Sequence, residues 1–201
     1  MATLPPLSAI LASTASPGDA LAQTLSVLFE PSPVLFSKIV PQLVPLLSLH
    51  SHSSITTYHE VVHAALAAIT DWDDDLKSQF IGGHPRIGES KNLSNLSANE
   101  QGAAVSPTPP EVLVRLTHLN ACYERRYPGL RYITFVNGRS RATIAEEMED
   151  CLGIEHSLST EPPVEGLEPV EMGSVEWTTE LNRAIMDVGR IAESRLGALG
   201  W

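Results

Sequence analysis

One histidine, His84, lies where a predicted helix meets a sharp bend, and a histidine side chain can donate or accept a proton near neutral pH. The helical pattern over residues 72–81 runs into Gly82-Gly83, and glycine commonly ends a helix in a left-handed conformation. Pro85 then favours extended backbone at His84, while Gly88 lets the chain turn again. This segment predicts either a histidine held at a corner for proton transfer or an exposed loop histidine beside a helix end.

A second pattern, His59-Glu60-Val61-Val62-His63, matches the H-E-x-x-H arrangement of zinc metalloproteases on a predicted helix. In that interpretation His59 and His63 bind the metal ion from successive turns, and Glu60 is the general base. Thr57 and Glu60 also form the pattern of a helix capping box, which would occupy the same carboxylate. No feature of the sequence selects a third metal ligand. The zinc peptidase is therefore an alternative for the structure to test.

The basic residues are concentrated in one part of an acidic chain. The formal net charge is -11, so long-range repulsion opposes binding to nucleic acid or to an anionic membrane. Six of the thirteen basic residues fall between positions 115 and 141, namely Arg115, Arg125, Arg126, Arg131, Arg139 and Arg141. This group predicts either a pocket for a small anionic substrate or helix-surface arginines that pair with Glu111, Glu124 or Glu146.

The composition indicates a globular protein in a reducing compartment. The 201 residues are 43% hydrophobic, which is enough to build a core. The sequence shows neither a secretory signal pattern nor an apolar stretch long enough to span a bilayer. Cys122 and Cys151 are expected to be reduced and buried. We therefore expect a cytoplasmic protein. A peroxisomal location is the alternative, although the last residues do not match the small-basic-leucine signal of peroxisomal proteins.

Helix signals recur along the chain and alternating strand patterns are almost absent, which predicts an all-α fold, a single multi-helix bundle domain over residues 1–201. Residues 1–15 are expected to form a flexible N-terminus. Residues 157–173 contain three prolines and several glutamates, and are expected to form a mobile loop. The last helix is expected to end at Gly197. The predicted helices cover residues 20–29, a segment from Ser32-Pro33 that Pro41 breaks, and residues 58–69, 72–81, 109–127, 143–152 and 175–196, with 131–136 extended.

Three segments that follow one another in the chain support a resemblance to a known family. They are the segment around His84-Pro85, the run Leu96-Ser97-Ala98-Asn99-Glu100-Gln101, and residues 119–140 with Asn137-Gly138-Arg139-Ser140 at their end. In order and spacing, over roughly residues 21–196, they resemble the 2-oxo-4-hydroxy-4-carboxy-5-ureidoimidazoline (OHCU) decarboxylase family. The resemblance implies an all-helical fold of the OHCU decarboxylase type and a homodimer. It also implies a carboxy-lyase of urate degradation that forms (S)-allantoin with neither metal nor organic cofactor.

The resemblance also assigns roles to six residues. His84 is similar to the family's catalytic histidine, and Pro85 to the proline that shapes its pocket. Arg139 matches an arginine expected to hold an anionic oxygen of the substrate.

The remaining three assignments fall in one short segment. Ser97, Glu100 and Gln101 match the family's Ser-x-x-Glu-Gln pattern, in which Glu100 is assigned to catalysis and the other two to substrate binding. Local chemistry leaves an alternative open, because Ser97 and Glu100 also form a capping-box pattern.

Two features depart from the family pattern. Arg86-Ile87 follows His84-Pro85 where many members have an acidic residue and a leucine, and a cation near His84 would lower the pKa of its ring. The loop 157–173 is longer than the usual connection before the last helix, which indicates either an added lid or a tolerated insertion, and we favour the insertion. A non-catalytic helical interaction protein on the same scaffold is the third interpretation.

Overall fold

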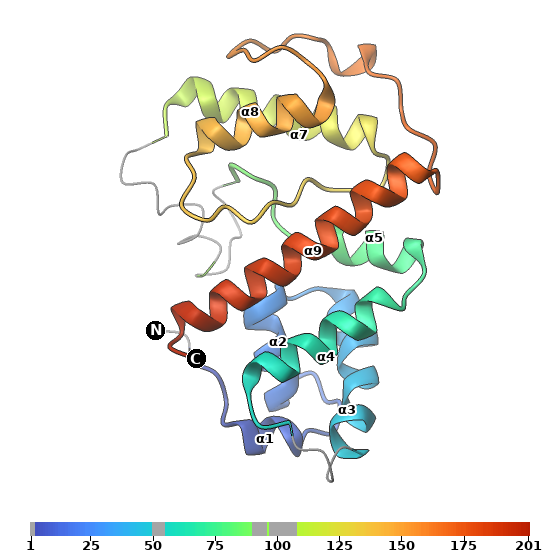
Figure 1. The fold of residues 1–201 in the computed structure, drawn as a ribbon, viewed down its shortest axis with the longest axis vertical. Helices are drawn as coiled ribbons and strands as arrows, with labels where there is room; N and C mark the ends of the chain where they lie inside the picture. Colours follow the sequence, from blue (N-terminus) through green and yellow to red (C-terminus); the bar gives the residue numbers. More distant parts are fainter. Residues whose placement is uncertain (1–2, 50–54, 90–95, 97–107) are drawn as a thin grey trace. The chain divides into compact units, whose positions relative to one another are not determined.

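The computed structural model describes residues 3–49, 55–89, 96 and 108–201, and every regular element within them is helical (Figure 1). This confirms the predicted all-α fold class. Within the same residues, none of the helices combines the length and apolarity needed to cross a membrane. The elements are α1 (Leu7–Leu11), α2 (Ala20–Phe29), the π-helical η1 (Leu35–Ile39), α3 (Val40–Leu49), α4 (Tyr58–Thr70), α5 (Asp74–Gly82), α7 (Pro110–Arg126), α8 (Arg141–Leu152), the 3-10 helix η2 (Val164–Gly166) and α9 (Val175–Ala198).

The chain forms two compact units. The first contains residues 1–84 and 185–201, and the second contains residues 85–184. This division does not decide whether the two units form one domain, so the expectation of one domain over residues 1–201 stays a prediction.

The first unit is built from α1 to α5 and the last part of α9. Thr57 and Glu60 form the predicted capping box at the start of α4: the Thr57 side chain accepts a hydrogen bond from the Glu60 amide, and the Glu60 carboxylate accepts one from the Thr57 amide. The buried face of α4 recurs at helical spacing and includes Val61, Ala65 and Ile69. These local signals explain why the predicted and observed bounds of α4 nearly coincide.

The prediction that Pro41 breaks the second helix is wrong. The helix begins as expected at Ser32, whose side chain accepts a hydrogen bond of 3.1 Å from the Leu35 amide. It then passes through the π-helical turn η1, which is closed by the Val40 amide bonding to the Leu35 carbonyl, and continues as α3. Because this wider turn directly precedes Pro41, the helix accommodates a residue that has no amide hydrogen and continues past it.

The N-terminal segment contains regular structure. Residues 7–11 form α1, and Ile10 in this helix is fully buried. The Tyr58 hydroxyl donates a hydrogen bond of 2.8 Å to the Pro5 carbonyl, so the segment before α1 is attached to α4. The expected flexible N-terminus therefore includes an anchored helix from residue 7 onward.

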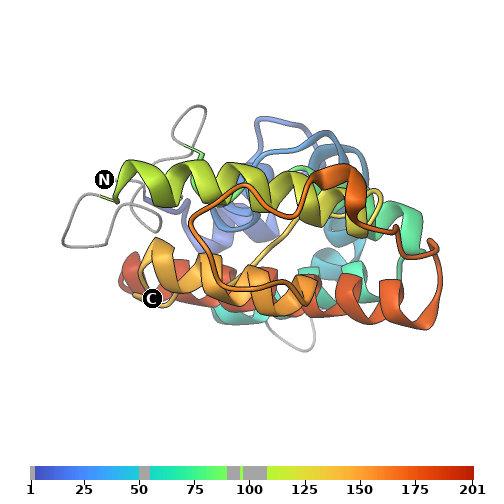
Figure 2. The same cartoon turned by 90° about the horizontal axis from the view of Figure 1, so that it is seen from above.

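The second unit is centred on α7 and α8, which pack against each other and lie side by side in Figure 1. The predicted stripe of α7, Val112, Leu116, Leu119 and Tyr123, is buried. Residues 131–136 carry no helix, in agreement with the prediction of an extended segment, but they form no strand either. Seen from above in Figure 2, the chain after α8 crosses back toward α7, where η2 contacts that helix.

The last helix, α9, carries the predicted apolar stripe, and all five of its residues are buried: Leu181, Ile185, Val188, Ala192 and Leu196. The prediction that Gly197 ends this helix is wrong, because α9 continues through it to Ala198. The left-handed residue that follows the helix is Gly200, with φ of 88°, and the Trp201 amide bonds back to the Leu196 carbonyl. Gly197 itself has no positive φ, so here glycine is tolerated inside the helix at a cost of about 1 kcal/mol.

Candidate active site

His84 lies two residues after α5, at the corner predicted from the sequence. Asp73 caps the start of α5 by accepting a hydrogen bond of 2.8 Å from the Leu76 amide, and the helix ends at Gly82. The His84 amide bonds back to the Ile81 carbonyl at 3.0 Å, which continues the turn beyond the helix. The helix thus fixes the backbone of His84, and the side chain is buried with 5% exposure.

The His84 ring is oriented by Phe80, one turn earlier on the same helix. His84 Nδ1 lies 3.2 Å from the Phe80 carbonyl oxygen, and the two rings meet edge to face with centroids 5.1 Å apart. A carbonyl oxygen can only accept, so Nδ1 must carry the hydrogen in this bond. The contact therefore selects the tautomer in which Nε2 is the basic nitrogen.

The reason for Gly83 differs from the predicted one. Gly83 has φ of -75°, so it does not adopt the left-handed conformation expected for a helix-ending glycine. A Cβ atom at this position would lie 2.7 Å from the Ser32 Cβ, closer than carbon atoms can approach. Glycine is needed here because the chain passes directly over Ser32.

The segment after His84 begins the second unit and is attached to α7. Arg86 pairs with both carboxylate oxygens of Glu124, at 2.5 and 2.9 Å, and its Nη1 lies 3.3 Å from Glu89. These two acidic partners raise the pKa of Arg86 and compensate its charge. The cation that we identified as a departure from the family pattern is therefore neutralised within its own unit.

The same segment turns at Gly88, as the sequence predicts. Gly88 has φ of 86°, a conformation that favours glycine. The Asn120 side chain, which is buried, donates a hydrogen bond of 2.9 Å to the Ile87 carbonyl and fixes the turn to α7.

Arg139, the predicted anion-binding residue, ends a tight turn directly before α8. Asn137 and Gly138 have φ of 46° and 75°, and the Arg139 amide bonds to the Val136 carbonyl at 3.0 Å. Two positive φ values with this bond define a type I′ turn, for which Asn-Gly is the favoured sequence. Ser140 then caps α8 by accepting a hydrogen bond of 3.1 Å from the Thr143 amide.

The Arg139 guanidinium is held by partners of its own unit. Nε donates to the Val136 carbonyl at 3.0 Å, and Nη2 donates to the Thr134 hydroxyl at 3.1 Å and to the Phe135 carbonyl. Nη1 forms an ion pair with Glu147, on the second turn of α8. Glu147 was missed in the sequence, although its acidic side chain lies on the helix that Arg139 precedes.

The six predicted site residues are distributed as follows. His84 belongs to the first unit, and Pro85 and Arg139 belong to the second. Ser97, Glu100 and Gln101 lie outside the described residues. The grouping of these residues into one site therefore stays a prediction.

The H-E-x-x-H pattern has a structural explanation in the first unit. Glu60 accepts hydrogen bonds from the Thr56 and Thr57 amides at 2.6 and 2.9 Å, which lowers its pKa, so its carboxylate is already occupied. His59 and His63 instead pair with Glu193 of α9, the latter at 3.3 Å. Across residues 3–49, 55–89, 96 and 108–201, no cluster of three or more acidic, histidine or cysteine side chains is arranged to hold a metal ion. The structure therefore gives the zinc peptidase no support.

A shallow groove of about 430 Å³ lies beside α4 in the first unit. Its lining is mostly apolar and includes Leu7, Tyr58 and Trp201, whose indole packs on the Tyr58 ring at 4.4 Å between centroids. Neither His84 nor Arg139 lines this groove. It does not coincide with the predicted site.

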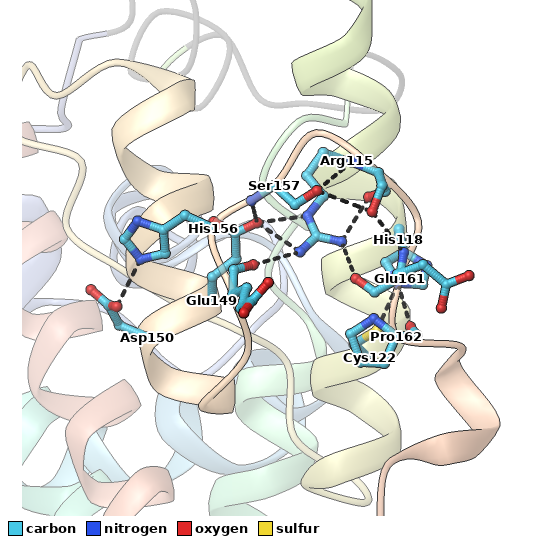
Figure 3. Close-up of polar contacts among 11 residues, drawn as sticks. Arg115, His118, Cys122, Glu149, Asp150, His156, Ser157, Glu161 and Pro162 are labelled. Carbon is cyan, nitrogen blue, oxygen red and sulfur yellow. Dashed lines mark hydrogen bonds and ion pairs between the residues drawn. The ribbon is translucent and has the colours of Figure 1, made fainter.

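The loop expected to be mobile is fastened to α7 by a buried arginine (Figure 3). Arg115 is fully buried and pairs with Glu149 of α8 at 2.7 Å. Its Nη1 also donates to the carbonyls of Ser159 and Glu161 at 2.7 and 2.8 Å. His118, one turn along α7, donates through Nε2 to the Pro162 carbonyl at 2.9 Å. We refer to these contacts of Arg115, Glu149 and His118 with residues 155–162 as the arginine clasp.

The nearby Cys122 does not form a catalytic pair with His118. Its sulfur lies 3.2 Å from His118 Nε2, but that nitrogen carries the hydrogen donated to Pro162 and cannot act as a base. Burial also raises the pKa of Cys122, so its thiol stays protonated.

Comparisons with known proteins agree with this architecture. The sequence profile of the family described as OHCU decarboxylase matches residues 14–162. A solved structure described as (S)-allantoin synthase has a similar fold, with a TM-score of 0.57 and 19% sequence identity over 98% of this chain. The chain spans 54% of the length of that protein. No curated protein matches the sequence.

Proposed function

The chain belongs to the OHCU decarboxylase family, and from this premise we propose that it converts OHCU to (S)-allantoin in urate degradation. The observation that carries the proposal is the extent of the family match, residues 14–162, which includes His84, the segment 97–101 and Arg139. The similar fold of the (S)-allantoin synthase structure supports the same chemistry. The proposed reaction uses no metal and no organic cofactor.

Decarboxylation requires a place for an electron pair and a source for one proton. When the carboxylate leaves as carbon dioxide, its bonding electrons remain on a ring carbon and spread into the conjugated ring. A proton delivered to that carbon from one face gives a single stereoisomer. Positioned charges, hydrogen bonds and one acid are sufficient for this chemistry.

We assign the proton delivery to His84 Nε2. The Nδ1 contact with the Phe80 carbonyl orients the ring, so protonation and deprotonation take place at the other nitrogen. Glu100 polarises the substrate together with His84 in this proposal, while Arg139, Ser97 and Gln101 bind and orient it. Pro85 shapes the pocket beside the histidine.

The test compares two variants of the histidine. His84→Asn keeps a side-chain N–H that can donate to the Phe80 carbonyl but cannot transfer a proton, whereas His84→Ala removes both. The exposed His63→Ala serves as the control. Each protein is mixed with freshly generated urate-oxidation product and its hydrolase, and allantoin handedness is followed by circular dichroism.

We expect both His84 variants to stay folded and to lose about 100-fold or more in rate, the usual scale for a positioned proton donor, while His63→Ala keeps the wild-type rate. A folded His84→Asn protein that forms (S)-allantoin at the wild-type rate would refute the assignment of His84. Racemic allantoin formed at the spontaneous rate by the wild-type protein would instead favour a non-catalytic interaction protein. The homodimer implied by the family is tested separately by light scattering.

A further inference from the structure

Glu147 forms an ion pair with the Arg139 guanidinium, which is the group that binds the substrate in the proposed function. All three guanidinium nitrogens of Arg139 donate hydrogen bonds, to Val136, Thr134, Phe135 and Glu147. These bonds use four of the five guanidinium N–H donors, and the fifth is on Nη1, the nitrogen that already donates to Glu147, so an anion that reaches it meets the Glu147 carboxylate.

Three of the four partners cannot leave easily. The carbonyls of Phe135 and Val136 belong to the backbone segment that enters the type I′ turn, which the bond from the Arg139 amide to the Val136 carbonyl holds. The Thr134 hydroxyl belongs to a buried residue of the same segment. These partners fix the plane of the guanidinium.

Glu147 is different, because it reaches Arg139 through a long side chain that is only half-buried. The Arg139 and Glu147 side chains are 32% and 33% exposed, so water and small solutes reach both. An incoming carboxylate would exchange one charge-assisted hydrogen bond for another of the same kind. An ion pair at this level of exposure contributes little to stability, and its exchange has a correspondingly small cost.

We propose that Glu147 is an internal carboxylate that occupies Arg139 in the empty enzyme and is displaced by the anionic substrate. This inference rests on the proposed function, because it gives Arg139 the role of binding an anionic oxygen. It makes Glu147 a specificity-determining residue: a neutral molecule cannot replace it at Arg139, whereas a carboxylate can.

The exchange also follows the charge change of the reaction. The anionic substrate releases neutral carbon dioxide and takes up one proton, so the product is neutral. Glu147 then returns to Arg139 and competes against retention of the product. The pair thus weakens substrate binding somewhat, but the anionic substrate can displace Glu147 whereas the neutral product cannot, which favours release of the product.

The test measures anion binding without turnover. Allantoate, a stable ureido carboxylate, and neutral allantoin are titrated into the wild-type protein, Glu147→Gln and Glu146→Gln by calorimetry at low salt. Glu146 is the matched control, because it is the exposed neighbour of Glu147 on α8 and its replacement changes the net charge equally. Circular dichroism checks that each variant is folded.

We expect Glu147→Gln to bind allantoate about two- to fivefold more tightly than the wild type and Glu146→Gln, which is the scale of one exposed ion pair. Allantoin binding is expected to be equal in all three proteins. Adding Arg139→Gln should abolish the advantage of Glu147→Gln. Equal or weaker allantoate binding by folded Glu147→Gln, or no measurable allantoate binding by any of the proteins, overturns the proposal.

The activity assay separates this inference from the proposed function. If the wild-type protein accelerates decarboxylation, Glu147→Gln should lower the KM by up to about fivefold without raising kcat. If the wild-type protein is inactive, the proposed function fails, and the allantoate titration still decides whether Glu147 competes for Arg139.

Discussion

The arginine clasp is predicted to be a major contributor to the stability of the second unit. Arg115 has 0% and Glu149 2% side-chain exposure, so the ion pair is removed from water. The replacement Arg115→Met keeps an unbranched chain beside α7 but removes the guanidinium. Glu149 would then keep only the Ser157 amide, at 3.0 Å, as a hydrogen-bond donor within the clasp.

The expected loss follows from these contacts. Removal of one partner of a buried ion pair costs about 3–5 kcal/mol, because the other charge stays buried without compensation. The carbonyls of Ser159 and Glu161 lose their donor as well, although water entering the vacated space offsets part of that loss. We therefore expect the free energy of unfolding to fall by about 4 kcal/mol.

Equilibrium unfolding in urea measures this change, with Arg125→Met as the control. Arg125 is exposed on the same helix, and its replacement should change the free energy of unfolding by less than about 0.5 kcal/mol. The double variant Arg115→Met with Glu149→Gln should recover part of the loss, because it removes the buried charge. Limited proteolysis should cut residues 155–162 faster in Arg115→Met than in the wild type.

A loss below about 1 kcal/mol in Arg115→Met would refute the reasoning, since the buried charge would then have found another partner. A double variant that is no more stable than Arg115→Met would show that lost packing, not an uncompensated carboxylate, sets the cost.

Two further predictions concern glycine and cysteine positions. Gly83→Ala should destabilise the protein by about 1–3 kcal/mol, because its Cβ would lie 2.7 Å from Ser32, whereas Gly82→Ala, with no atom within 4 Å of the new Cβ, should be neutral or stabilise by up to about 1 kcal/mol. Thermal unfolding of both variants checks this, and a Gly83→Ala protein as stable as Gly82→Ala would contradict it. Burial raises the pKa of Cys151 to about 11. At pH 8 the Cys151 thiol should therefore react with a disulfide reagent far more slowly in the native protein than in the protein unfolded in urea. The folded state binds this proton more tightly, so the stabilising contribution is complete below about pH 8.5 and is lost as the pH rises through 11. Equal reaction rates in the native and unfolded protein would show that the thiol is not protected.

Local signals in the sequence predicted a structural feature correctly wherever the physical cause of that feature lies within about one helical turn. The capping box of Thr57 and Glu60 predicted the start of α4, and the buried stripe of α7 followed from its periodicity. The positive φ of Gly88 was predicted from the residue type alone. The family was also identified from short segments in order, and the profile match over residues 14–162 confirms it.

The features that were missed depend on residues distant in the chain. Gly83 is required by Ser32, about fifty positions earlier, and not by a left-handed helix end. The loop 157–173 has the composition of a mobile segment, yet Arg115 fastens its beginning from more than forty positions away.

The sequence by itself therefore determined the helical fold class, the family and the corner at His84, because periodicity, caps and turn residues act through the neighbouring backbone. Only the tertiary structure decided which charges meet. It assigned Glu193 to His59 and His63, Glu149 to a buried clasp and Glu147 to Arg139. The physical reason is that a carboxylate carries the same charge at every position, and its partner is chosen by the packing that brings an arginine or an amide within reach.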